Sequence, residues 1–137
     1  MNYKKVILYT DGASRGNPGE SGIGIWIGDE KQNSLKEFSK YIGSATNNFA
    51  EYTALIEGLK LCLDVTSEEV NAFLDSELVV KQLNGIYRVK NINIKPLYEQ
   101  VVVLKNKFKK VTFTHIRREF NKTADALANK GINQKIK

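Results

Sequence analysis

The chain has few residues that could form disulfides, and no segment suited to crossing a membrane. It contains one cysteine among 137 residues, so no internal disulfide is possible. Cys62 lies in a leucine-rich stretch, where a buried core thiol is expected rather than a nucleophile. No apolar run approaches the roughly 20 residues that a membrane-spanning helix needs. A strand-like run begins close to Met1, so we expect no signal peptide or transit segment and a cytoplasmic, reducing location.

Negative charge is scarce in the second part of the chain. Residues 1–80 contain 7 Lys or Arg and 12 Asp or Glu, which gives a net charge of −5. Residues 81–137 contain 14 Lys or Arg and 3 Asp or Glu, which gives a net charge of +11. The whole chain carries a formal net charge of +6. An excess of this size favours a nucleic-acid-binding surface over a role in solubility alone. Charge does not distinguish DNA from RNA or from a hybrid of the two.

The hydrophobic pattern divides the chain into a strand-rich part and a part in which strands and helices alternate. Apolar runs predict an antiparallel meander of three strands at residues 6–9, 23–27 and 35–42. The first strand is expected to end at Asp11-Gly12, before a glycine-rich turn. Beyond it, helices are predicted at 48–63, 76–83, 96–108 and 121–131, and strands at 70–74 and 111–116. This order predicts an α/β fold in which one domain, residues 1–137, has a mixed sheet with helices on both faces.

Four acidic residues occupy the edges of these predicted elements. Asp11 and Asp75 each follow an apolar strand, and Glu51 and Asp125 lie near the start of a helix. Each has an ordinary structural explanation when taken alone. These are a turn hydrogen bond for Asp11, a capping box for Glu51, a helix N-cap for Asp75 and a favourable helix dipole for Asp125. Taken together, the four placements put the carboxylates at one end of one sheet.

A cluster of carboxylates at one place predicts a metal site. Four such groups within a few ångströms would repel one another strongly unless cations were bound. Hard oxygen ligands with no histidine or cysteine nearby select Mg²⁺ or Mn²⁺ over zinc. Two such ions roughly 3.5–4 Å apart form a known arrangement for in-line phosphoryl displacement. A negative pocket in a basic protein is therefore expected to act on a phosphate backbone.

Four segments of the chain resemble the type 1 ribonuclease H family in order and in spacing. They are Tyr9-Thr10-Asp11-Gly12 with Gly16-Asn17-Pro18-Gly19, residues 46–51, residues 74–80 and residues 121–128. The resemblance implies a ribonuclease H-like fold, with a five-stranded mixed sheet flanked by helices. It implies endonucleolytic hydrolysis of the RNA strand of RNA–DNA hybrids, giving 3′-hydroxyl and 5′-phosphate ends. Asp11, Glu51, Asp75 and Asp125 match the family's four catalytic acids, which bind two Mg²⁺ ions.

The resemblance also implies contacts with the hybrid. Asn17, Asn47 and Asn48 match positions that contact the minor groove, and Ser76 is expected at the same groove. Thr46 matches a residue that binds a phosphate of the DNA strand. Short amides donate and accept hydrogen bonds, which suits base edges and a 2′-hydroxyl. Roles in turns and helix caps are the structural alternative for these residues.

Several features depart from the larger members of the family. Residues 84–96 are too short for the basic protrusion, so the chain is similar to the compact members. Basic residues there are expected to supply some substrate contact and a steep salt dependence: Lys81, Arg88, Lys90 and Lys95. His115 is expected to be a structural residue near the end of the last strand, and Glu77 is not expected to contact substrate. Arg118, in the loop before the last helix, is expected to contact phosphate near the metals.

Two other functions are compatible with the residues. One is a catalytically silent hybrid-binding module, which the intact carboxylates disfavour because binding alone does not need them. The other is a detached ribonuclease domain of a reverse transcriptase. A related nuclease acting on DNA is disfavoured by the three asparagines. We expect a monomer without a small-molecule cofactor.

Overall fold

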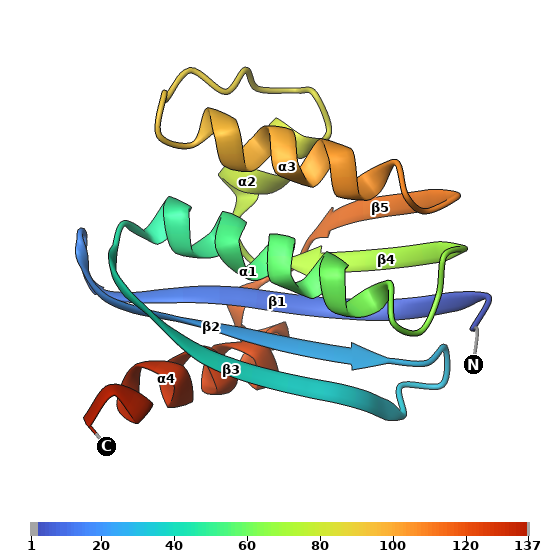
Figure 1. Ribbon diagram of the computed structural model, residues 1–137, viewed down its shortest axis with the longest axis horizontal. Coiled ribbons are helices and arrows are strands. Elements are labelled where there is room, and N and C mark those ends of the chain that lie inside the picture. Colours follow the sequence, from blue (N-terminus) through green and yellow to red (C-terminus); the bar gives the residue numbers. More distant parts are fainter. Residues whose placement is uncertain (1–2, 137) are drawn as a thin grey trace.

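The computed structural model describes residues 3–136 and consists of a five-stranded mixed sheet with helices on both faces (Figure 1). The strands are β1 (Lys5–Gly16), β2 (Gly19–Gly28), β3 (Ser34–Ala45), β4 (Glu69–Leu74) and β5 (Lys110–His115), in the spatial order β3-β2-β1-β4-β5. The helices are α1 (Asn47–Cys62), α2 (Glu77–Leu83), α3 (Lys95–Lys105) and α4 (Lys122–Asn133), with 3₁₀ turns η1 (Arg118–Phe120) and η2 (Gln134–Ile136). The predicted antiparallel meander, β1 to β3, is confirmed, and β4 and β5 join it in parallel.

The core lies between one face of the sheet and α1. Alternation along β1 and β2 turns Val6, Leu8 and Ile25 to this face, where they are fully buried. Apolar residues spaced three and four apart on α1, among them Leu55 and Leu59, pack against these strand residues. Helix α3 packs against α1. Burying each such side chain contributes about 1.5–3 kcal/mol. Cys62 is fully buried in the same cluster, as the sequence predicts.

The other face of the sheet is covered by α4, which lies behind the strands in Figure 1 and contacts β2, β3 and β1. Glycines on β2 make this contact close. A Cβ added at Gly24 would lie 2.1 Å from the backbone oxygen of Ala124, so only glycine allows α4 to approach this near. Gly24 pairs with Asp11 across the strands. The first turn of α4 is therefore held next to Asp11.

The first strand is longer than predicted. β1 does not end at Asp11 but runs on to Gly16, because β2 supplies an antiparallel partner along that whole length. The parallel pairing with β4 stops earlier, at Tyr9 and Phe73. Asp11 thus lies in the middle of a strand, yet just beyond the point where its other neighbour ends. Its carboxylate therefore faces the carboxyl end of β4, although the residue is buried.

Several helix boundaries also differ from the prediction by one to three residues, and α4 continues past Gly131 to Asn133. Helix α1 begins at Asn47, and Thr46 caps it by accepting a hydrogen bond of 3.2 Å from the backbone N–H of Phe49. Helix α3 ends at Lys105, and Phe108 is buried in the turn that follows. Within residues 3–136, the structure contains no helix with the length and apolar character needed to span a bilayer.

Candidate active site

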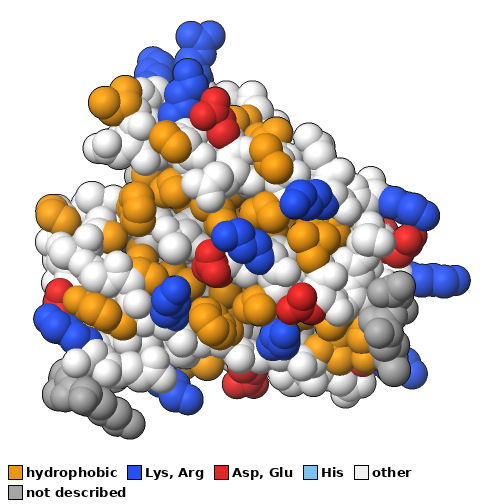
Figure 2. Space-filling view, in the orientation of Figure 1, with side chains coloured by type: hydrophobic (Ala, Val, Ile, Leu, Met, Phe, Trp, Pro, Cys, Tyr) orange, Lys and Arg blue, Asp and Glu red, His pale blue; other side chains and the backbone are white. Residues whose placement is uncertain are grey.

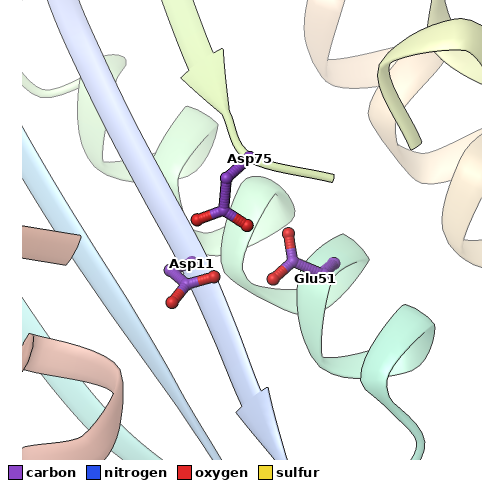
Figure 3. A group of neighbouring side chains, drawn as sticks. All are labelled: Asp11, Glu51 and Asp75. Carbon is purple, nitrogen blue, oxygen red and sulfur yellow. The ribbon is translucent and has the colours of Figure 1, made fainter. Parts of the chain in front are cut away.

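Three of the four predicted carboxylates converge at the carboxyl end of β4. Ligand oxygens of Asp11, Glu51 and Asp75 all lie within 4.8 Å of one another. Asp11 comes from the middle of β1, Glu51 from α1 and Asp75 from the residue after β4, and Figure 3 shows the carboxylates pointing toward one another. Residues far apart in the sequence therefore form one acidic site.

Glu51 is positioned by a close contact between α1 and β1. A Cβ added at Gly12 would lie 2.2 Å from the backbone carbon of Ala50, so glycine is required where the helix crosses the strand. The backbone N–H of Gly12 donates a hydrogen bond of 2.8 Å to Oε1 of Glu51. Glu51 is the fifth residue of α1 and contacts the strand. The capping-box explanation for Glu51 is therefore wrong, since Thr46 caps the helix and Glu51 lies too far along it.

Asp75 is held by Asn121, a residue that the sequence did not single out. Nδ2 of Asn121 donates to Oδ2 of Asp75 at 2.8 Å and to the backbone oxygen of Thr10 at 3.0 Å. Asn121 stands at the N-cap position of α4, but its side chain makes no capping bond there. An asparagine just before a helix is typical of an ordinary N-cap, so the sequence did not indicate that Asn121 orients Asp75. Ser76, not Asp75, caps α2 by accepting from the N–H of Val79 at 3.2 Å.

The electrostatics of the site favour a bound proton or cation. Burial raises the pKa of Asp11 well above its usual range, and the Glu51 and Asp75 carboxylates and a hydrogen bond with Asp125 raise it further. Burial also raises the pKa of Glu51, while hydrogen bonds from Asp11 and Gly12 and the charge of Arg118 lower it. Oε2 of Glu51 is buried without a hydrogen-bond partner. An orphaned carboxylate oxygen beside two others is the donor set of a divalent cation.

Asp125 lies beside this group of three, in the first turn of α4. It falls outside the set of oxygens within 4.8 Å, but its carboxyl is close enough to Asp11 to raise the pKa of that residue. Nδ2 of Asn129 donates to Oδ1 of Asp125 at 3.3 Å and to its backbone oxygen at 3.0 Å. The Asp125 side chain is therefore oriented from within its own helix.

Among the residues predicted to contact the hybrid, Asn17 is joined to the Thr46–Asn48 segment by a hydrogen bond. Oδ1 of Asn17 accepts a hydrogen bond of 3.0 Å from the backbone N–H of Asn47, which joins the β1–β2 turn to the start of α1. Thr46 and Asn47 are exposed and Asn48 is half-buried. The capping alternative holds for Thr46 and Ser76, since the hydroxyl of each caps a helix.

The remaining predicted residues flank this site. Arg118 is exposed at the start of η1, and its charge lowers the pKa of Glu51. His115 is the last residue of β5, as expected. The carboxylate of Glu77 pairs with Nζ of Lys81 at 3.2 Å along α2.

Comparison with known proteins identifies the family. A family model described as reverse transcriptase-like matches residues 9–131. The chain is 37% identical to ribonuclease HI of Halobacterium salinarum, over 93% of this chain and 64% of that one. It superimposes on the crystal structure of LC11-RNase H1 in complex with RNA/DNA hybrid with a TM-score of 0.91 and 42% identity, over 96% of this chain and 99% of that one. The chain belongs to the type 1 ribonuclease H family.

The four sequence segments predicted a type 1 ribonuclease H of the compact form, and the comparisons confirm this prediction. The chain is also 40% identical to a bifunctional protein of Mycobacterium tuberculosis, over 91% of this chain. It spans 35% of that relative's length and 64% of the Halobacterium protein's length. The similarity is thus to the ribonuclease H part of longer proteins as well as to compact ones.

Proposed function

We propose that this ribonuclease H hydrolyses the RNA strand of RNA–DNA hybrids endonucleolytically, leaving 3′-hydroxyl and 5′-phosphate ends, and that residues 1–137 act as one domain. The convergence of Asp11, Glu51 and Asp75 within 4.8 Å carries this proposal. Similarity to LC11-RNase H1, which was solved with an RNA/DNA hybrid, supports the substrate. The intact acidic cluster argues against a silent binding module, because binding alone does not need buried carboxylates that repel one another.

The four acids are the proposed ligands of two Mg²⁺ ions, with Mn²⁺ as the alternative. When bound, such ions lower the pKa of the attacking water and stabilise charge on the leaving 3′ oxygen. The chain's own contribution is to hold the carboxylates in place. Gly12 fixes one oxygen of Glu51, and Asn121 fixes one oxygen of Asp75, so each acid keeps a second oxygen free for a ligand.

Recognition of the hybrid is assigned to the surface beside the acids. The side-chain oxygen of Asn17 accepts a hydrogen bond from the backbone N–H of Asn47. The side-chain amide hydrogens of Asn17 are then left to donate to the minor groove. Asn47, Asn48 and Ser76 are proposed to contact the same groove, and Thr46 a DNA-strand phosphate. Arg118 is proposed to contact phosphate next to the carboxylates, because its charge already acts on Glu51.

Basic side chains near α2 and α3 are proposed to add non-specific attraction. Figure 2 shows Lys and Arg side chains projecting at the top of the molecule, where Figure 1 places the connection between α2 and α3. That connection contains Arg88 and Lys90. Neutralising phosphates with such residues makes binding fall steeply with salt.

The decisive experiment compares labelled RNA–DNA hybrid, duplex DNA and duplex RNA, each incubated with Mg²⁺ or with chelator. Only the RNA strand of the hybrid is expected to be cut, and only with metal. Asp11→Asn is expected to abolish cutting while the variant still binds the hybrid. Cutting of duplex DNA, or full activity in chelator, would overturn the proposal. Binding of hybrid without any cutting by the unaltered chain would favour the silent module instead.

A further inference from the structure

A row of aromatic side chains crosses the sheet on the face opposite α1. Tyr9 of β1 is the direct cross-strand partner of Trp26 on β2 and of Phe73 on β4. The Tyr9 and Phe73 rings stack with centroids 5.2 Å apart and an interplanar angle of 24°. The Trp26 ring meets Tyr9 edge-on at 5.6 Å. All three side chains are half-buried, so this row presents aromatic surface to solvent.

Two members of the row, Tyr9 and Trp26, form the floor of a pocket whose wall is the segment between β5 and α4. The pocket has a volume of about 240 Å³ and is lined by Tyr9, Trp26 and residues 119–123. Ligand pockets for drug-sized molecules begin at roughly 300 Å³, so this one suits a smaller group such as a single flat ring system. Phe120, in the wall, is 67% exposed, so its ring is accessible to a ligand in the pocket.

The pocket adjoins the carboxylate site, and basic residues lie in and next to the segment that forms its wall. Asn121 lines the pocket, and its side chain also holds Asp75. Lys122 and Glu119 line the pocket, and Arg117 and Arg118 are exposed in the wall segment just before Glu119. Glu119 pairs with Arg117 at 3.3 Å. A phosphate near this wall segment meets Arg118 and Lys122, which Glu119 does not neutralise. Aromatic surface next to cationic side chains is the arrangement that binds single-stranded nucleic acid.

We propose that this pocket binds an unpaired base of the substrate, in a nucleotide that extends from the end of the hybrid. The inference rests on the proposed function and adds a second feature to the substrate, a single-stranded extension of RNA or DNA. The base would stack against the Tyr9 and Phe120 rings, and its phosphate would lie against the Arg118 and Lys122 side chains. Stacking is tolerant of base identity, because every base has an aromatic face.

The test measures binding in chelator, where nothing is cut. Three labelled substrates share one hybrid: a blunt form, one with a short unpaired RNA extension and one with the same extension in DNA. Fluorescence anisotropy is expected to show at least fivefold tighter binding of an extended form than of the blunt form, since one stacked base is worth about 5- to 150-fold. Comparison of the RNA and DNA extensions tells which strand supplies the base.

Trp26 is the only tryptophan in the chain, so its emission reports on the pocket itself. An extended hybrid is expected to quench Trp26 emission more than the blunt hybrid does. Phe120→Ala is expected to remove the preference for extended hybrid, and Phe120→Tyr to keep it. Val103→Ala is the matched control, because Val103 is 60% exposed on α3, on the other face of the sheet.

The outcomes separate the two proposals. Equal affinity of the unaltered protein for all three substrates, together with metal-dependent cutting of the blunt hybrid, refutes the pocket and leaves the proposed function standing. Equal loss of the preference in Phe120→Ala and Val103→Ala also refutes it. Failure to cut any hybrid in Mg²⁺ removes the proposed function, and the inference about the pocket falls with it.

Discussion

Replacing Asp11, a proposed catalytic acid, is expected to stabilise the metal-free protein. Asp11 is 5% exposed, and burial and the neighbouring carboxylates raise its pKa. The folded state therefore holds the proton more tightly than the unfolded state does. The stability that this proton contributes is complete below the unfolded pKa of about 3.9 and is lost as the pH rises above it. Asp11→Asn removes this loss, because the amide is neutral at every pH of the experiment.

The size of the effect follows from the linkage between protonation and folding. Each unit by which the pH exceeds the unfolded pKa costs at most about 1.4 kcal/mol, so the ceiling at pH 7 is roughly 4 kcal/mol. The actual effect is expected to be smaller than this ceiling, because part of the repulsion falls on Glu51 and because the side chains of the site can move apart. We therefore expect Asp11→Asn to raise the free energy of unfolding by about 2–3 kcal/mol at pH 7. For a domain of this size, that corresponds to roughly 10 °C in Tm.

The measurement is thermal and urea unfolding in chelator at pH 4, 5.5 and 7. The gain of Asp11→Asn is expected to be largest at pH 7 and nearly absent at pH 4. Added Mg²⁺ is expected to reduce the difference in free energy of unfolding between Asp11→Asn and wild type, because the ion binds the folded wild-type protein. Asp64→Asn is the control, since Asp64 is an exposed acid whose carboxylate pairs with Nζ of Lys36 at 3.2 Å. A variant less stable than wild type at pH 7, or a gain that does not change with pH, would falsify the reasoning.

Three further substitutions test the supports of the site. Asn121→Ala is expected to weaken Mg²⁺ binding about 10- to 100-fold, measured by calorimetry, because Asp75 loses the bond that orients it; unchanged affinity would contradict this role. Gly12→Ala is expected to cost about 3 kcal/mol or more in urea unfolding, because its Cβ would overlap the Ala50 backbone; a cost below about 1 kcal/mol would show that the helix can move away. Thr46→Ala is expected to lose about 1 kcal/mol of stability through the missing cap, and Thr46→Ser to retain it. Weaker hybrid binding by both Thr46 variants would show that the methyl group matters as well.

Much of the fold follows from local patterns. The apolar alternation in β2 and the helical spacing in α1 are properties of short segments, and both elements formed where the patterns predicted them. The end of β1 was predicted wrongly, because Asp11-Gly12 has turn chemistry and only the partner strand β2 keeps the chain extended through it. The role of Asn121 was missed for a similar reason. Its partners, Thr10 and Asp75, lie 111 and 46 residues away in the sequence.

The sequence by itself determined which acids are present, roughly where the strands and helices lie and which family the chain resembles, because residue type and hydrophobic period are local. The tertiary structure alone decided that Asp11, Glu51 and Asp75 meet within 4.8 Å. It also decided that aromatic residues of three strands form one row, since a register shift of one residue would turn Phe73 to the opposite face from Tyr9. Strand pairing and the glycine contacts between helix and sheet fix those distances. Both depend on contacts between segments that are far apart in the sequence, so no single segment predicts them.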